Sequence, residues 1–294
     1  MSNDGKFEVS LYNYQEFLKS SGFSQETVDE VRDKIAIHEI IPKYITNGQI
    51  LSYLIHSKGN ADDCAHIILT YYKHKNEFKE FLRNRDPESK EITNCFNNMW
   101  FATFPVTACN CNIFYMALQN FDPKNYNFES SIKAFVMVAE AYLYRNGPRT
   151  DTILVFDMMG AKFRHSLKAS MSSRKKVVNF LENATPLYIK AVHFFNTAPF
   201  MAYIHALLKP FSTTGLLHRV YLHNSNINWN DFYHKHIPKS NLPKDYGGDL
   251  PSIKELHESE RNILINLKEY FKLEEQQVNH ELDHIAEESK TVHL

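Results

Sequence analysis

ILVFDMMG, at residues 153–160, is the stretch that decides the fold. Its run of four apolar residues, closed by Asp157 and Gly160, is typical of a buried strand that ends in a turn. Residues 187–196 read LYIKAVHFFN, a second strand pattern, and residues 174–187 before them have helical character. Strand, helix and strand in this order predict parallel strands joined by a helix.

The same alternation continues on both sides of this unit. Residues 113–118 and 219–222 have strand patterns. Residues 130–144 have a broad apolar helical face, and Asn146-Gly147-Pro148 stops that helix. We therefore predict an α/β fold whose mostly parallel sheet is flanked by helices.

The chain before this sheet is predicted to be helical. Residues 24–42, residues 49–56 and a segment starting at Asn60 carry apolar residues at helical spacing, with short connections, which favours a three-helix bundle. After Gly248 the chain reads as helical and charged, without a strand signal. The expected organisation is an N-terminal helical module over residues 1–90, an α/β domain over residues 91–255 and a charged helical tail over residues 256–294.

Residues 199–211, PFMAYIHALLKPF, form a helix that is apolar almost all round. Pro199 suits the first turn of this helix, and Lys209-Pro210 ends it. A helix that is apolar on both sides is either buried on both sides or turned toward lipid. Periodicity alone leaves a central core helix as an equal alternative.

The composition limits the classes of function. Lys and Arg total 33 and Asp and Glu total 34, which gives no overall attraction to nucleic acid. The 21 Phe and 16 Tyr suit a large core, or a lined ligand cavity. The four sparse cysteines favour reduced thiols in the cytosol. No signal peptide and no membrane-spanning run are expected.

One motif points to an enzyme. His280-Glu281-Leu282-Asp283-His284 matches H-E-x-x-H, which places two imidazoles on one helix face with a glutamate as base. Only ten residues follow His284, too few to form a substrate groove, so we favour a solvated terminal helix. Asp157, at the end of a buried strand, could hold a metal but more often caps the next turn.

The strand, strand and apolar helix above are followed by LLHRVYLH at residues 216–223 and LPKDYGG at residues 242–248. Taken together, they resemble the CRAL-TRIO lipid-transfer family, in particular its tocopherol- and retinaldehyde-binding members. The match runs over about residues 50–253. The resemblance implies an N-terminal three-helix bundle and a sheet domain that encloses a hydrophobic pocket. The family's leucine-and-arginine signature keeps its leucines at residues 50–58 but lacks the arginines.

The resemblance also implies which residues hold the ligand. The apolar helix corresponds to a mobile gate, with Phe200, Ile204 and Leu207 closing over the pocket. A serine can fix the ligand head in tocopherol-binding relatives, where this chain has Phe135 and Ala139. Half of a phosphoinositide-binding patch is present. The expected pocket residues are Ile132, Phe135, Ala139, Phe156, Phe180, Leu181, Val192 and Phe194; the gate residues are Phe200, Ile204, Leu207, Leu208 and Phe211; the patch residues are Lys190 and Arg219.

The expected protein is a cytoplasmic monomer, peripheral to membranes, that binds an oily molecule and transfers it between membranes. Candidate ligands are a retinoid, a carotenoid, a tocopherol-like prenol, a sterol or another long lipid. Weak phosphoinositide contact is expected. We expect the protein to catalyse no reaction, to have no catalytic residue and to bind no cofactor, metal or nucleic acid. The alternatives are a ligand-sensing adaptor that docks through the charged tail, and a zinc hydrolase built on His280 and His284.

Overall fold

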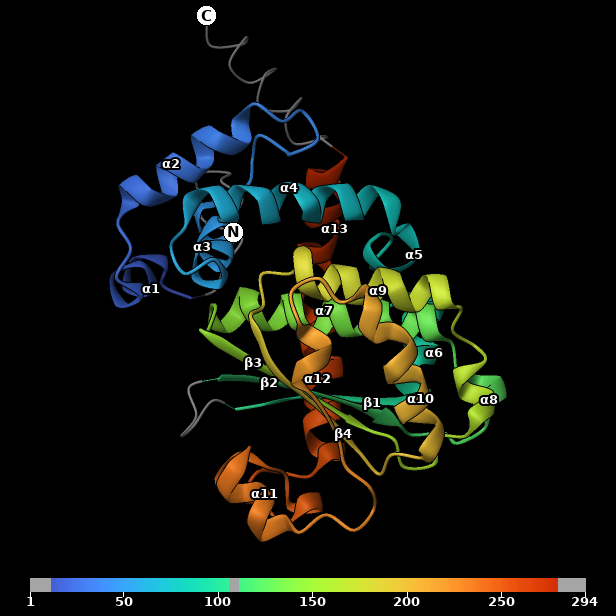
Figure 1. Cartoon of the computed structure of the whole chain (residues 1–294). Helices are drawn as coiled ribbons and strands as arrows, with labels where there is room; N and C mark the ends of the chain where they lie inside the picture. Colours follow the sequence, from blue (N-terminus) through green and yellow to red (C-terminus); the bar gives the residue numbers. More distant parts are fainter. Residues whose placement is uncertain (1–11, 106–110, 280–294) are drawn as a thin grey trace, which may run out of the picture.

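A computed structural model describes residues 12–105 and 111–279. Its centre is a five-stranded sheet with the strands in chain order (Figure 1). The strands are β1 (Met99–Phe104), β2 (Cys111–Leu118), β3 (Asp151–Asp157), β4 (Ile189–Phe195) and β5 (Val220–Leu222). β1 pairs antiparallel with β2, and all other neighbours are parallel. The predicted mostly parallel α/β fold is therefore confirmed, with β1 as an edge strand that the pattern did not predict.

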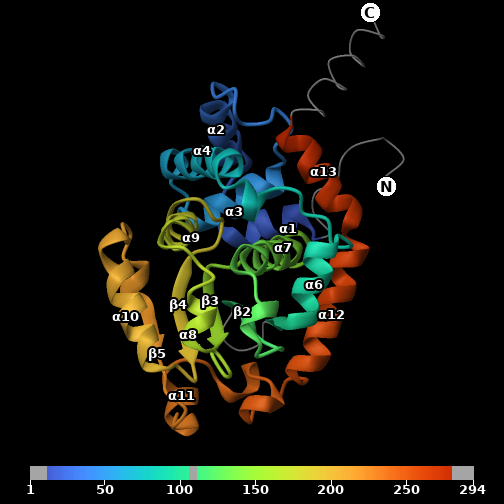
Figure 2. The same ribbon diagram turned by 90° about the vertical axis from the view of Figure 1, so that its right-hand side faces the viewer.

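The helices that connect the parallel strands lie on one face of the sheet, and later segments cover the other face (Figure 2). The connecting helices are α7 (Phe128–Asn146), α8 (Phe163–Ser166), α9 (Met171–Asn183) and α10 (Pro199–Leu208). α11 (Trp229–Lys235) packs under the opposite face, and α12 (Ile253–Asn266) runs along β1. The predicted helices and strands of this region are thus found with ends shifted by a few residues.

Alternation along the strands separates two cores. On β3, Ile153 and Val155 face α11, whereas Leu154 and Phe156 face the connecting helices. This follows from the two-residue period of a strand, which sends successive side chains to opposite faces. After β3 the chain turns at Gly160, where φ is 75° and an added Cβ would meet the Phe121 ring. The turn therefore requires glycine.

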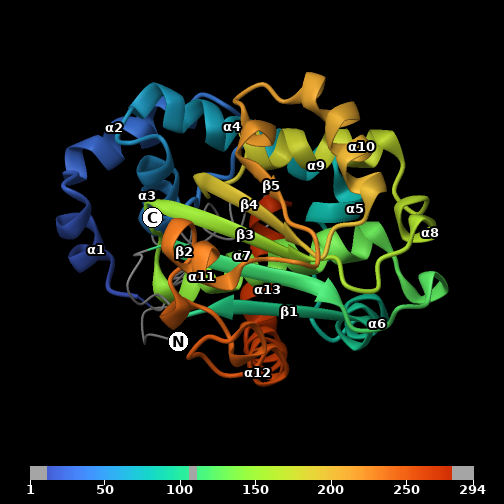
Figure 3. The same cartoon turned by 60° about the horizontal axis from the view of Figure 1, so that its bottom comes forward.

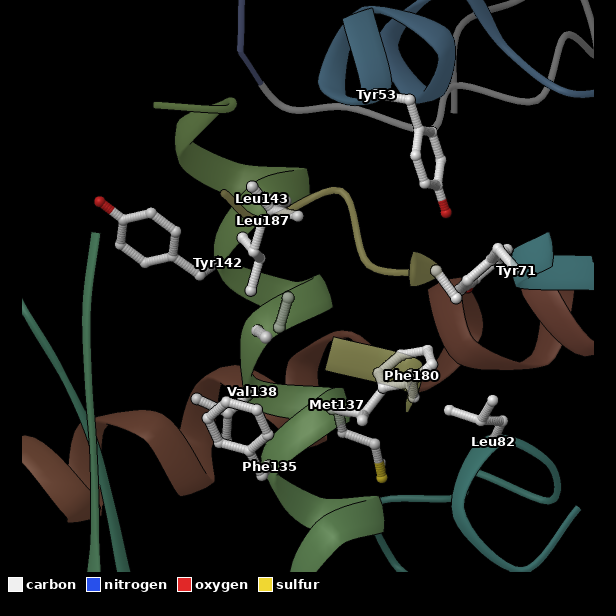
Figure 4. Packing of buried hydrophobic residues seen from close by; sticks show 14 of the residues in the cluster. Tyr53, Tyr71, Leu82, Phe135, Met137, Val138, Tyr142, Leu143, Phe180 and Leu187 are labelled. Atoms are coloured by element: carbon white, nitrogen blue, oxygen red, sulfur yellow. The ribbon is translucent and has the colours of Figure 1, made fainter. Parts of the chain in front are cut away.

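Within residues 12–98, six helices precede the sheet: α1 (Tyr14–Ser21), α2 (Gln25–Ala36), α3 (Asn47–His56), α4 (Ala61–Glu77), α5 (Lys79–Leu82) and α6 (Lys90–Asn98). α2, α3 and α4 are the three predicted helices, and Ser24 caps α2 as expected by accepting the Thr27 N–H. Tyr53 and Tyr71 from α3 and α4 lie in the same buried cluster as Phe135 on α7 (Figure 4). Because this core crosses from the helices to the sheet, the division into three parts stays a prediction.

The charged segment after residue 255 is helical as far as the structure describes it, and it is not merely a solvated tail. In α13 (Lys268–Val278), Glu274 Oε2 lies 2.8 Å from Lys75 Nζ and 3.3 Å from Arg85 Nη2. The Lys75 and Arg85 side chains have no exposed surface, and Arg85 also pairs with Glu140 of α7. The acidic residue is thus a buried link between three parts of the chain.

The structure shows the state of three of the four cysteines. Cys64 and Cys95 are free and buried, whereas Cys111 is disulfide-bonded. The prediction that all four thiols are reduced is therefore wrong, since sparse cysteines indicate a compartment only on average.

Within residues 12–105 and 111–279, no helix is long and apolar enough to cross a bilayer.

Candidate ligand-binding cavity

A cavity of about 250 Å³ lies between the sheet and the helices that connect its strands. Its floor is the sheet face that carries Leu154, Phe156, Val192 and Phe194. The side chains of α8, α9 and α10 form the walls, and Figure 3 shows α8 and α10 at the opposite end of the molecule from α1 and α2. The wall is almost entirely apolar. This arrangement suits a hydrophobic molecule of moderate size.

α10 is the outer wall of the cavity, and its two sides differ. Phe200, Ile204 and Leu208, spaced four residues apart, line the cavity. Tyr203 and Leu207, on the other side, are 66% and 40% exposed. The i, i+4, i+8 spacing explains the split because such residues share one helix face. Pro199 opens the helix, as predicted.

The end of α10 is fastened by polar contacts. His205 Nε2 lies 2.7 Å from the Leu217 carbonyl oxygen. Past α10, the buried Glu182 carboxylate accepts hydrogen bonds from Ser212 Oγ, from Thr213 N at 2.7 Å and from Leu216 N at 2.9 Å. Burial, the largest influence, raises the pKa of Glu182, but these hydrogen bonds together lower it overall. The carboxylate therefore stays ionised and anchors the chain beyond the helix.

Five of the eight predicted pocket residues line the cavity: Ile132, Phe156, Leu181, Val192 and Phe194. Phe135, Ala139 and Phe180 do not. They border a separate cavity of about 70 Å³ with Tyr53 and Tyr71, on the side of the N-terminal helices. These three residues lie at the other cavity because α7 and α9 each have apolar residues toward two neighbours, and the apolar pattern of such a helix does not distinguish them.

Of the predicted gate residues, Phe200, Ile204 and Leu208 line the cavity, whereas Leu207 and the 44% exposed Phe211 face outward. The expectation that Leu207 closes over the pocket is therefore corrected. Further wall residues, in the sheet and in the segments around α8, were not predicted from the sequence. Leu154 could have been found, since it lies two residues before Phe156 on the same strand. Tyr126, His165 and Arg174 carry no such signal.

The two predicted patch residues point to different partners. Lys190 Nζ lies 2.8 Å from Asp151 Oδ2. The Arg219 guanidinium donates to the Ile189 carbonyl at 2.6 Å and lies beside a further cavity of about 350 Å³ that Tyr188 and His56 also line. Lys190 is not part of that wall. Of the two predicted patch residues, Arg219 therefore faces this cavity and Lys190 does not.

Asp157 caps the turn after β3, as predicted. Its Oδ1 accepts the Met159 N–H at 2.8 Å and the Asn196 amide at 2.7 Å, and its Oδ2 accepts the Tyr246 hydroxyl at 2.6 Å. Among the described residues, no three His, Cys, Asp or Glu side chains are arranged to hold a metal ion. His280, Glu281 and His284 lie outside the described residues.

A family model for the CRAL/TRIO domain matches residues 107–248, the range that contains the sheet core, the cavity and α10. Residues 107–248, just under half of the chain, therefore match the CRAL/TRIO domain. This domain begins just before β2 and ends after α11, so the family's range includes every strand except β1.

Several known proteins are similar to this chain. An alpha-tocopherol transfer protein-like protein of Homo sapiens is 24% identical over 227 residues, which cover 74% of this chain and 65% of that protein. Clavesin-1 of Rattus norvegicus is 24% identical over 237 residues, covering 77% of this chain and 64% of clavesin-1. The match thus spans just under two thirds of these relatives. The crystal structure of Sfh5 aligns with a TM-score of 0.48 and 10% identity, covering 85% of this chain and 82% of Sfh5.

Proposed function

We propose that this protein binds one long hydrophobic molecule in the cavity and transfers it between membranes without catalysing a reaction. The observation that carries the proposal is a nearly apolar cavity whose outer wall, α10, is apolar on both sides. The tocopherol-transfer name of one relative supports the same class of ligand. A retinoid, a carotenoid, a tocopherol-like prenol, a sterol or another long lipid fits this class.

The outer surface supports docking on a membrane. Exposed Tyr203, Leu207 and Phe211 lie along the α10 side, and Phe163 and Leu167 add exposed apolar surface near α8. The Phe163 ring centroid lies 5.9 Å from that of Phe200, so these segments are in contact. Large apolar side chains that gather on one surface mark an interaction site. In the proposed cycle, α10 swings outward, its outer side enters the lipid and the cavity opens.

The affinity required for this role is attainable. A ligand of about 30 heavy atoms that gains roughly 0.3 kcal/mol per atom would bind with about 9 kcal/mol, which corresponds to sub-micromolar affinity. Opening of α10 would then set the rate of exchange. Weak phosphoinositide contact at Arg219 belongs to the proposal, with little contribution from the ion-paired Lys190.

Mass spectrometry of an organic extract of the purified protein tests the proposal. We expect one lipid class at near-stoichiometric amount, and transfer of that lipid between vesicles. An empty extract, repeated after incubation with a broad lipid mixture, would contradict it and favour the ligand-sensing adaptor. Zinc content after dialysis tests the hydrolase alternative at His280 and His284.

A further inference from the structure

The mainly apolar cavity wall has its polar residues at the α8 end, where Asp157, Lys162 and Ser166 lie with two further hydrogen-bond donors. His165 lies in α8 and Arg174 in α9, and both line the cavity. Tyr126 links them, because its ring centroid lies 5.6 Å from that of His165 and its hydroxyl interacts electrostatically with Arg174. The far end, around Leu216 and Val220, is hydrocarbon. The cavity therefore has a polar pole and an apolar pole.

The His165 ring presents an unused donor. Its Nδ1 accepts the Lys162 backbone N–H at 3.0 Å, which leaves the proton of the neutral ring on Nε2. Burial, the largest influence, lowers the pKa of His165, so the ring is neutral near pH 7. The side chain is 6% exposed, and Nε2 has no hydrogen-bond partner among the described residues. Buried donors in native proteins are nearly always paired, so this one calls for a partner.

Arg174 presents a cation without an acidic partner. Its guanidinium donates to the Ser166 carbonyl and forms no ion pair within residues 12–105 and 111–279. Burial lowers the pKa of Arg174. The acids nearby are engaged elsewhere: Glu129 accepts from Ser173 Oγ at 3.1 Å, and Asp122 accepts the Lys124 N–H. Asp157 already accepts its three hydrogen bonds.

We infer that the ligand is a long-chain lipid acid whose carboxylate lies between Arg174 and His165, with its hydrocarbon chain directed toward Val220. This inference rests on the proposed lipid-binding function and narrows its ligand class. The Arg174 guanidinium and the free Nε2–H of His165 can only donate, and a guanidinium matches the two oxygens of a carboxylate. An alcohol, an ester or a hydrocarbon would leave the positive charge without a counter-ion.

A competition experiment tests the head group directly. Lipid-free full-length protein is incubated with phosphatidylcholine vesicles that contain equal amounts of palmitic acid, hexadecanol and methyl palmitate, and the protein-bound lipids are quantified by mass spectrometry. We expect the acid to exceed the alcohol and the ester by about ten- to hundredfold, the range of a charge-assisted hydrogen bond. Arg174→Gln should abolish the preference but keep uptake of the alcohol. His165→Gln should weaken the preference.

Matched variants separate the possible failures. Lys175→Gln, which removes the neighbouring cation that lies 3.6 Å over the exposed Phe211 ring, should keep the preference. Arg174→Lys, which keeps the charge without the planar fork, should keep part of it. Equal uptake of all three lipids by the unchanged protein would overturn the carboxylate inference and leave the cavity function standing. No uptake of any of the three would also overturn the carboxylate inference, and the organic extract of the purified protein would then decide separately on the proposed function.

Discussion

At the scale of single residues, the clearest titratable feature is a group of histidines under the sheet. His193 of β4 is buried, and its Nδ1 lies 3.0 Å from His223 Nε2. Burial, together with the charges that His236 and His223 would carry, lowers the pKa of His193 to about 3. The two neighbours also have lowered pKa values, chiefly through burial. This face of the sheet is therefore built for neutral imidazoles.

Acid should destabilise the protein through His193. Since the folded pKa lies below the unfolded value of about 6.5, the unfolded chain binds more protons, and stability falls as the pH drops below about 6.5. The loss should reach about 2–3 kcal/mol near pH 4.5. Denaturant titrations across this range measure it. His193→Gln should flatten the profile relative to the exposed His218→Gln, and an unchanged slope would contradict the assignment.

At the scale of elements, α10 has an inner and an outer side with different tasks. Ile204→Asp places a charge in the apolar cavity wall, so lipid uptake should be lost while the fold is kept. Tyr203→Asp, one position away on the exposed side, should leave the bound lipid in place and slow its delivery to vesicles. Lipid content and vesicle transfer rates distinguish the two. Unchanged transfer by Ile204→Asp would remove α10 from the gate role.

A second prediction at this scale concerns Glu182, whose carboxylate anchors the chain beyond α10. Glu182→Gln replaces an ionised acceptor of several buried hydrogen bonds, so the unfolding free energy should fall by about 1–3 kcal/mol and lipid exchange should accelerate. Because the folded pKa of Glu182 lies below the unfolded value, its contribution is present above about pH 4.5 and is lost in stronger acid. Ser172→Ala, at an exposed position of the same helix, is the control for exchange rates. Equal rates in both variants would refute the anchor.

At the scale of the whole molecule, α13 holds the N-terminal helices and the sheet domain together. Glu274 forms ion pairs with both Lys75 and Arg85, and Arg85 also forms an ion pair with Glu140. Desolvation lowers the pKa of Lys75, and the adjacent carboxylates oppose that effect. Breaking a buried charge pair from one side costs more than its net contribution, since the remaining charge is left in a low dielectric.

Removing this link should be strongly destabilising. Glu274→Ala should lower the unfolding free energy by about 3–5 kcal/mol, because Lys75 and Arg85 would stay buried without a counter-charge. Glu269→Ala, which breaks an exposed pair with Lys272 on the same helix, should change little. Chemical denaturation followed by circular dichroism measures both variants. Similar losses in the two would show that α13 is held by apolar contacts alone.

The local patterns of the sequence determined the elements and their order. Apolar runs closed by Asp157 and by Asn196 predicted β3 and β4, and the βαβ order predicted parallel pairing, because a strand's two-residue period and a helix's 3.6-residue period are written in neighbouring residues. The apolar pattern of residues 199–211 predicted α10, and the family resemblance added five of the wall residues, Ile132, Phe156, Leu181, Val192 and Phe194. These features depend on short-range sequence alone.

Only the tertiary structure decided which side of each buried helix faces the cavity. Ala139 borders the cavity beside the N-terminal helices, Leu207 turns outward, and Glu274 is buried although its segment reads as a charged tail. His165 and Arg174 meet at one cavity wall only because α8 and α9 fold back over the sheet. A one-dimensional pattern records that a side is apolar or charged, but the partner that covers it is set by long-range packing.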